Sequence, residues 1–373
     1  MADESGVTIQ LRLFVTASLN EYTDMTNIWK RARKKPRCFS AMQSESGQRM
    51  RHADAATVDR LLDYPGLVEA LREAHLADAM PQLHTEIMTE AGDGANKFVS
   101  LIAWAARDLI AVKLVGVFPA NVNMSPPQPS VQGLVALFSG KTGEVLLTGD
   151  GASLTFRKTA ADSALAADLL ARRDARTLLV VGAGGLAPHV IEAYLSVRPS
   201  LTRVLIWNRN PGKAEALAQR LRHFPASVSA MADLPSALPE ADIISCVTMA
   251  SEPLVQGALL KPGAHVDLIG AYLPQMREAD DDVVRRAGKI FVDTRANCEG
   301  SGDIGQPIAS GLITRHRIVA DLFDLCTGRH PGRTTESEIT MYKNVGGGHL
   351  DLFTARHLLH RMSTAVIGAG GGT

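Results

Sequence analysis

A glycine-rich turn in the middle of the chain constrains the fold more than any other feature. The apolar run Leu178–Val181 leads directly into G-A-G-G-L-A at Gly182–Ala187, and a helical pattern follows. In a strand–turn–helix unit Gly182 permits the tight turn, Gly184 lets the backbone approach a pyrophosphate, and Ala187 allows close helix–strand packing. The helix N-terminus offers free N–H groups and a partial positive charge to phosphates. The sequence therefore predicts a dinucleotide-binding loop with contacts from Gly182, Gly184, Gly185, Leu186 and Ala187.

The residues after the next strand indicate which dinucleotide is bound. The strand Val204–Trp207 lies about 20 residues beyond the glycines and ends in Asn208 and Arg209. A site for NAD normally places Asp or Glu here to bond the ribose 2′-hydroxyl, whereas an uncharged Asn followed by Arg suits a 2′-phosphate. We expect Asn208 and Arg209 to bind NADPH, with NADH the less expected cofactor. A glycine turn in some other kind of α/β domain is the alternative.

Composition narrows the classes of function. The 373 residues leave room for two domains, and Lys+Arg balance Asp+Glu at 39 each, so no overall field favours nucleic acid or an anionic membrane. The four cysteines lie far apart without a C-x-x-C pair, which indicates a reducing compartment rather than a disulfide scaffold or zinc site. No charge-free apolar run approaches the roughly 20 residues of a membrane span. We expect a cytoplasmic enzyme with no metal, nucleic-acid or membrane partner.

The first 50 residues differ from the rest. They contain the basic run Lys30–Arg37 and little apolar periodicity. A transit peptide would avoid the acidic residues present here, and a short basic run is more often solvated surface than a nucleic-acid-binding arm. We expect residues 1–50 to be a poorly ordered extension, or Met50 to be the true start. Ordered structure is predicted to begin near Arg51 with a helical pattern.

The remaining chain alternates between two kinds of pattern. A small sheet is expected first, because strand-like runs are separated by glycine turns at residues 98–102, 110–118, 133–138 and 145–148. An alanine-rich helix is then predicted from about Leu154 to Ala171, with Ser153 as its cap, and Arg172–Arg176 as the link to the nucleotide domain. Further α/β alternation follows to about residue 292, and helical material is predicted from Glu336 to Met362.

Five segments together resemble the ornithine cyclodeaminase/mu-crystallin family over about residues 51–362. They are Val112–Pro119, Leu154–Ala166, the loop at Gly182, Trp207–Arg209 and Ile269–Glu278. The resemblance implies an α/β fold in which a Rossmann-type nucleotide domain (173–310) is inserted into an α+β substrate/dimerisation domain (51–172 and 311–373). It also implies a homodimer joined through the substrate-domain sheets.

The resemblance also implies how a substrate carboxylate is held. Lys113 matches the lysine of the family's V-K-L-V segment, which contacts the carboxylate, and an ammonium among apolar flanks needs such an anionic partner. A surface lysine on an edge strand is the alternative. The family's R-T-A-A reads Lys158–Ala161 here, so Lys158 takes the place of the carboxylate-binding arginine, unless the preceding Arg157 replaces it through a different helix rotation.

Two further positions depart from the family pattern. The arginine of its P-x-R segment is Leu83, which leaves His84 as the nearest polar substitute or as a structural histidine. The aspartate of its G-G/A-D-x-P segment, which handles the amino group in cyclodeaminases, is Tyr272. A neutral phenol is no resting carboxylate base at neutral pH, so Tyr272 is expected to donate a hydrogen bond or to pack against the substrate ring.

The family positions that remain are cofactor and loop contacts. Thr248, Lys343 and Asn344 resemble segments that flank the nicotinamide, and Asp303 resembles a loop near the substrate. The resemblance then implies an NADPH-dependent reductase of cyclic ketimino acids, with a role in proline and other amino-acid metabolism, that yields proline or pipecolate. The alternatives are a lyase (ornithine cyclodeaminase or 3-hydroxyproline dehydratase) and a non-enzymatic NADPH-dependent protein that binds small molecules.

Overall fold

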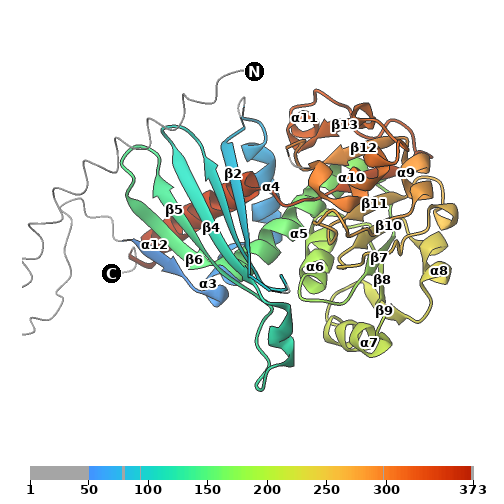
Figure 1. The fold of residues 1–373 in the computed structure, drawn as a ribbon, viewed down its shortest axis with the longest axis horizontal. Coiled ribbons are helices and arrows are strands. Elements are labelled where there is room, and N and C mark those ends of the chain that lie inside the picture. Colours follow the sequence, from blue (N-terminus) through green and yellow to red (C-terminus); the bar gives the residue numbers. More distant parts are fainter. Residues whose placement is uncertain (1–49, 78–79, 93, 297, 371–373) are drawn as a thin grey trace, which may run out of the picture. The chain divides into compact units, whose positions relative to one another are not determined.

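The computed structural model describes residues 50–77, 80–92, 94–296 and 298–370. The predicted extension, residues 1–50, lies outside the described residues apart from Met50. The described chain contains two β-sheets, each with helices packed on it (Figure 1). The first described strand, β1, begins at Arg51.

The first sheet has six strands in the order β1-β6-β5-β4-β3-β2. Neighbours from β2 to β6 pair antiparallel, and β1 pairs parallel with β6. The glycine turns between alternating runs predicted β3 to β6, whereas β2 was not predicted. The strands are β1 (Arg51–Ala53), β2 (Gln82–Thr89), β3 (Lys97–Trp104), β4 (Leu109–Val117), β5 (Val131–Ser139) and β6 (Val145–Asp150).

Helices cover one face of this sheet. Alternate residues of β4 are buried, with Leu109, Ala111, Lys113 and Val115 on the covered face, and α12 packs against β3, β4 and β5. Figure 1 shows α12, from the end of the chain, beside the helices that precede β2. Both ends of the described chain therefore build this domain, as expected. The helices are α3 (Ala55–Leu61), α4 (Tyr64–Ala74), α5 (Gly151–Leu170) and α12 (Gly348–Gly370).

Side-chain caps fix where these helices begin. The Asp63 carboxylate accepts the Gly66 N–H at 2.9 Å, and Pro65 sits in the first turn of α4, where its missing N–H costs no hydrogen bond. Helix α5 is capped by Asp150, which accepts the Ser153 N–H at 2.7 Å. The predicted cap at Ser153 is therefore wrong by three residues, because an aspartate stood one turn earlier.

The second sheet is entirely parallel and has eight strands in the order β13-β12-β14-β11-β10-β7-β8-β9. The strand order reverses between β7 and β10, so the loop after β7 lies at a topological switch point, where such sheets bind ligands. The strands are β7 (Thr177–Val181), β8 (Arg203–Trp207), β9 (Ser227–Met231), β10 (Ile243–Cys246), β11 (His265–Leu268), β12 (Lys289–Val292), β13 (Ile318–Asp321) and β14 (Thr340–Lys343).

Helices alternate with these strands and complete a Rossmann-type domain, as predicted. They are α6 (Ala187–Val197), α7 (Pro211–Arg220), α8 (Leu234–Ala237), α9 (Asp281–Ala287), α10 (Gly302–Ala309) and α11 (Leu322–Cys326). Short 3-10 helices are η1 (Pro119–Asn123), η2 (Leu238–Glu240), η3 (Gly257–Leu259), η4 (Cys298–Gly300) and η5 (Arg315–Arg317). Within the described residues, no helix combines the length and apolar character that crossing a membrane requires.

The predicted domain boundary at residue 310 is wrong. Strands β13 and β14 belong to the parallel sheet, so the chain leaves the nucleotide domain only after Lys343. The predicted helical stretch from Glu336 is interrupted for the same reason, and helix begins at Gly348. A four-residue buried run such as Thr340–Lys343 is too short for its sequence pattern to distinguish a strand from a helix. It forms a strand because it pairs with both β11 and β12.

Candidate functional site

Three charged side chains from distant parts of the chain meet in the first domain. Lys113 of β4, Lys158 of α5 and Asp351 of α12 are each at most 4% exposed. The Lys113 Nζ lies 3.0 Å and the Lys158 Nζ 3.1 Å from the same atom, Asp351 Oδ1. The structure thus brings together the two lysines expected to hold a carboxylate, and it places a carboxylate oxygen between them. We refer to Lys113, Lys158 and Asp351 as the lysine cluster.

The cluster holds more positive than negative charge. Two ammonium groups face one carboxylate in a buried setting, where unbalanced charge is costly. Burial lowers the pKa of Lys113 from 10.5 to about 8, and the attraction of Asp351 opposes this shift. The other oxygen of Asp351, Oδ2, is buried and has no hydrogen-bond partner in the described part of the chain. The site is therefore suited to a further anion and still has a free acceptor.

The loop before α12 fixes the position of Lys158. The Lys158 Nζ donates to the carbonyl oxygens of Gly346 at 2.8 Å and Gly347 at 3.4 Å. That loop is held by the buried Asp293, whose Oδ2 accepts the Gly346 N–H at 2.8 Å. Burial raises the pKa of Asp293, whereas the N–H groups it accepts favour its charged form. Asp293 is thus a positioning residue for the lysine cluster.

Arg157 does not join the lysine cluster, although it precedes Lys158. Its guanidinium Nε lies 3.2 Å from Asp59 Oδ1, its Nη1 lies 3.5 Å from Glu192 Oε1, and it stacks over the Tyr64 ring at 4.6 Å. The carboxylate-binding role considered for Arg157 is therefore corrected. Successive residues of a helix point about 100° apart, so only one of the two could face β4.

His84 also lies away from the cluster. The register of the sheet places His84 beside Ile102 and Val112, whereas Lys113 is level with Leu101 and Thr85. Side chains alternate between the faces of a strand, so His84 points to the face opposite Lys113 and is exposed there. The substrate-binding expectation for His84 is corrected for this reason.

The glycine loop after β7 has the geometry that a dinucleotide needs. Gly182 has φ +121°, and a Cβ there would lie 2.9 Å from the Val247 carbonyl oxygen, so only glycine fits. At Gly184 no described atom lies within 4 Å of the Cβ position, which leaves open space beside the backbone. Helix α6 starts at Ala187, and no side chain of the described residues caps it after Leu186. These residues fit a pyrophosphate at the helix N-terminus.

Asn208 and Arg209 differ in their surroundings. Asn208 Oδ1 accepts the Ala183 N–H of the glycine loop at 3.2 Å, and its Nδ2 donates to the Asn210 carbonyl at 2.9 Å. Asn208 therefore positions the loop. Arg209 is exposed and forms no ion pair with any other described residue, so its guanidinium is free for a ligand.

Thr248 is tied to a buried glutamate that the sequence analysis did not single out. The Thr248 N–H and hydroxyl both donate to Glu278 Oε1, at 2.7 and 2.9 Å, and the Gly270 N–H donates to Oε2 at 2.7 Å. A Cβ at Gly270 would lie 1.7 Å from the Thr248 carbonyl oxygen, so the loops after β10 and β11 touch. Burial raises the pKa of Glu278 to about 7. Glu278 positions the loop that carries Thr248.

Three further residues expected near the ligands are buried: Lys343, Asn344 and Asp303. Lys343 Nζ lies 3.1 Å from Asp303 Oδ2, and both side chains are completely buried. Asn344 donates to the Thr159 carbonyl at 3.1 Å and to the Ser163 hydroxyl at 3.0 Å. Asp303 is thus the partner of Lys343 rather than a residue of an open loop, which corrects its expected place.

Tyr272 follows β11 and is 41% exposed. Its phenol has no hydrogen bond or ion pair within the described residues, and partial burial raises its pKa. The group is therefore neutral and free to meet a ligand. Besides Asp293 and Glu278, the sequence analysis missed Asp351. The acidic residue at the start of a glycine-preceded helical pattern, G-G-G-H-L-D, was the available indication.

Comparison with known proteins gives one consistent result. The sequence pattern of the Ornithine cyclodeaminase/mu-crystallin family matches residues 53–365. Delta(1)-pyrroline-2-carboxylate reductase of Paracoccus denitrificans is 40% identical over 87% of this chain and 99% of its own length. Protein SAR DEFICIENT 4 of Arabidopsis thaliana is 41% identical over 67% of this chain and 77% of its own.

A solved structure agrees with these sequence relatives. Thermococcus litoralis Delta(1)-pyrroline-2-carboxylate reductase, in complex with NADH and L-proline, superimposes with a TM-score of 0.79 at 26% identity. The similarity covers 85% of this chain and 98% of that protein.

Proposed function

This chain belongs to the ornithine cyclodeaminase/mu-crystallin family, and from that premise we propose that it reduces cyclic ketimino acids with a nicotinamide cofactor. It is an oxidoreductase that acts on a C=N bond with NAD(P)H. Its substrates in this proposal are Δ1-pyrroline-2-carboxylate, which gives proline, and Δ1-piperideine-2-carboxylate, which gives pipecolate. The relative from Paracoccus denitrificans, matched over nearly its whole length, supports the five-membered ring.

One observation carries the proposal: two buried ammonium groups converge on a single carboxylate oxygen. Asp351 Oδ1 lies 3.0 and 3.1 Å from the two lysine Nζ atoms. An incoming carboxylate can use the same donors through charge-assisted hydrogen bonds. Lys113 and Lys158 would hold the substrate there, so the main contribution of the protein is to position the imine carbon.

The cofactor would bind at the glycine loop and supply the hydride. The open backbone at Gly184 and the uncapped start of α6 suit the pyrophosphate. We favour NADPH, because Arg209 is free and the strand before it ends without a carboxylate. In this proposal Thr248 lies near the nicotinamide, whereas the buried Lys343 and Asn344 support it from behind.

Tyr272 bears on the choice between reduction and cyclodeamination. Because its pKa is raised, the phenol is neutral and unable to act as a resting base. Reduction of a protonated imine needs no such base, so Tyr272 would donate a hydrogen bond or pack on the ring.

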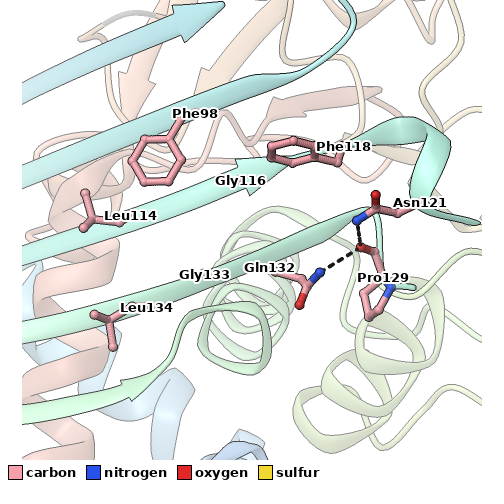
Figure 2. Close-up of a pocket in the computed structure, with 9 residues that line it drawn as sticks. All are labelled: Phe98, Leu114, Gly116, Phe118, Asn121, Pro129, Gln132, Gly133 and Leu134. Carbon is pink, nitrogen blue, oxygen red and sulfur yellow. Dashed lines mark hydrogen bonds between the residues drawn. The ribbon is translucent and has the colours of Figure 1, made fainter. Parts of the chain in front are cut away.

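We also propose that two copies associate through the exposed face of the first sheet. Phe98, Leu114 and Leu134 project from the face opposite Lys113 and line a shallow apolar groove (Figure 2). Exposed apolar residues gathered in this way mark an interface. Leu134→Arg should convert the dimer to a monomer in sedimentation velocity. A parent protein that is monomeric at micromolar concentration would rule out this interface.

Product analysis tests the proposed reaction. The purified chain is given NADPH or NADH with each cyclic imine, and separately ornithine with NAD. We expect cofactor oxidation with formation of proline or pipecolate, and no ammonia from ornithine. Ammonia release without imine reduction would identify a cyclodeaminase. A further assay supplies 3-hydroxyproline, and its dehydration would identify a dehydratase. Binding without turnover of any of these compounds would identify a binding protein.

A further inference from the structure

We propose that Asp351 accepts the N–H of the protonated imine, and so selects α-imino carboxylates over other small carboxylates. This inference rests on the proposed function. It assigns a catalytic contact to a residue of α12 that the family resemblance did not indicate.

The first argument is the unequal use of the two oxygens of Asp351. Oδ1 contacts both lysines, at 3.0 and 3.1 Å, whereas Oδ2 has no partner in the described part of the chain. The side chain is 2% exposed, so the solvent does not satisfy Oδ2. A buried acceptor without a donor is destabilising, and a ligand that brings an N–H removes that cost.

The second argument is the match between the cluster and an α-imino acid. Such a molecule has its nitrogen on the carbon that bears the carboxylate, so an anionic oxygen and a cationic N–H lie side by side. The lysine cluster offers the complement, two ammonium donors beside one carboxylate acceptor. The protonated imino acid has no net charge, so its binding pairs each charge without changing the total.

The same contact favours the form of the substrate that accepts hydride. A carboxylate next to the nitrogen stabilises the protonated C=N group. Hydride from the reduced nicotinamide adds to the imine carbon, and the π electrons of C=N become the nitrogen lone pair. The N–H bond is kept, and the neutral amine takes one proton from water after release. Asp351 stays ionised throughout and transfers no proton.

A neighbouring histidine is a poorer acceptor. Both ring nitrogens of His349 also lack partners among the described residues. Its ring, however, packs against the rings of His75 at 5.7 Å, Phe323 at 5.8 Å and Phe353 at 5.8 Å, within an aromatic group. Among the described residues, only Asp351 forms ion pairs with both lysines.

Two planar anions test the inference without turnover. Pyrrole-2-carboxylate has a ring N–H beside its carboxylate, and furan-2-carboxylate has a ring oxygen in the same place. Calorimetry on the chain saturated with NADP⁺ should show tighter binding of the pyrrole by about ten- to a hundredfold, the range of one charge-assisted hydrogen bond. In Asp351→Asn and Asp351→Ser this preference should fall to about threefold or less.

The control is Asp108→Asn. It removes the surface carboxylate that pairs with Arg356, a residue of α12 like Asp351. It should keep the full preference. Equal binding of both anions by the parent chain would overturn the inference, even if both variants fail to fold, and so would a preference that survives in a folded Asp351→Asn. A parent that reduces imines without this preference leaves the proposed function intact, whereas a parent that neither binds the anions nor reduces imines refutes the function itself.

Discussion

Two buried aspartates that contact lysine, Asp303 and Asp351, differ in how many of their oxygens have a hydrogen-bond donor. In the nucleotide domain, Lys343 contacts Asp303 Oδ2, and Asp303 Oδ1 accepts the Glu278 N–H at 2.8 Å. In the lysine cluster, two ammonium groups share one oxygen of Asp351, and the other oxygen has no donor among the described residues. Both oxygens of Asp303 have a donor and its charge is paired, so this carboxylate needs no further partner. The carboxylate of Asp351 has one oxygen left to accept from a ligand. We therefore regard the first as structural and the second as the substrate site.

Breaking the ion pair between Lys343 and Asp303 should have the largest effect of all, a loss of folding stability. Lys343→Met leaves Asp303 charged and buried without its partner, so the free energy of unfolding should fall by about 3–5 kcal/mol. Urea denaturation measures this loss. Asp108→Asn removes one partner of an exposed pair and should cost about 1 kcal/mol or less. If both variants unfold at the same urea concentration, the Lys343 pair is not structural.

Removing one lysine of the cluster should instead reduce activity. In Lys113→Met, Asp351 keeps Lys158 as a partner, so stability should change little. The substrate carboxylate loses one buried charge partner, worth about 3 kcal/mol, so kcat/KM should fall on the order of a hundredfold. Steady-state kinetics and the cofactor Kd check this together. An unchanged kcat/KM, or a loss of cofactor binding of similar size, contradicts the assignment.

The end of β8 offers a similar contrast: the amide oxygen and nitrogen of Asn208 both have partners within the chain, whereas Arg209 forms no ion pair with any described residue. If Arg209 binds a 2′-phosphate, Arg209→Ala should weaken NADPH by about 1.5–3 kcal/mol, ten- to a hundredfold in KM, and leave NADH nearly unchanged. Comparing both cofactors in both proteins measures this. Equal efficiency of NADPH and NADH in the parent would argue against a phosphate site.

A pH titration gives the smallest expected effect near neutral pH. Lys113 has a pKa lowered to about 8, so its ammonium is present below pH 8 and is lost above it. Binding of pyrrole-2-carboxylate should therefore be constant from pH 6.5 to about 7.5 and then weaken, approaching tenfold per unit above pH 8. Lys113→Arg keeps its charge and should bind the anion evenly to pH 10. A parent that also binds evenly to pH 10 would show that Lys113 does not titrate there.

Local patterns predicted a large part of this molecule. The glycine loop, the run of sheet strands from Lys97 to Asp150 and the alanine-rich helix α5 are formed as expected. The family and the fold class are confirmed by the match over residues 53–365 and by the superimposed reductase. These features depend on residues close in sequence or on the order of whole segments. Both can be read directly from the amino-acid sequence.

Other features depended on the direction in which a side chain points, which differs between neighbouring residues of a strand or a helix. His84 and Leu83 lie on opposite faces of β2, and Arg157 and Lys158 point in different directions from α5. The order of residues alone left open whether Arg157 or Lys158 faces the carboxylate, and whether His84 replaces the arginine lost at Leu83 or is structural. Packing of the sheet and the helices made that choice.

Asp351 shows most clearly what the sequence alone did not reveal. It is separated by 238 residues from Lys113, and only the packing of α12 on β4 brings the two side chains together. The sequence by itself determined which segments form strands, helices and the glycine loop, because these follow from neighbouring residues. The partner of each buried charge was decided by the tertiary structure, because electrostatic contact depends on separation in space and burial makes every unpaired charge costly.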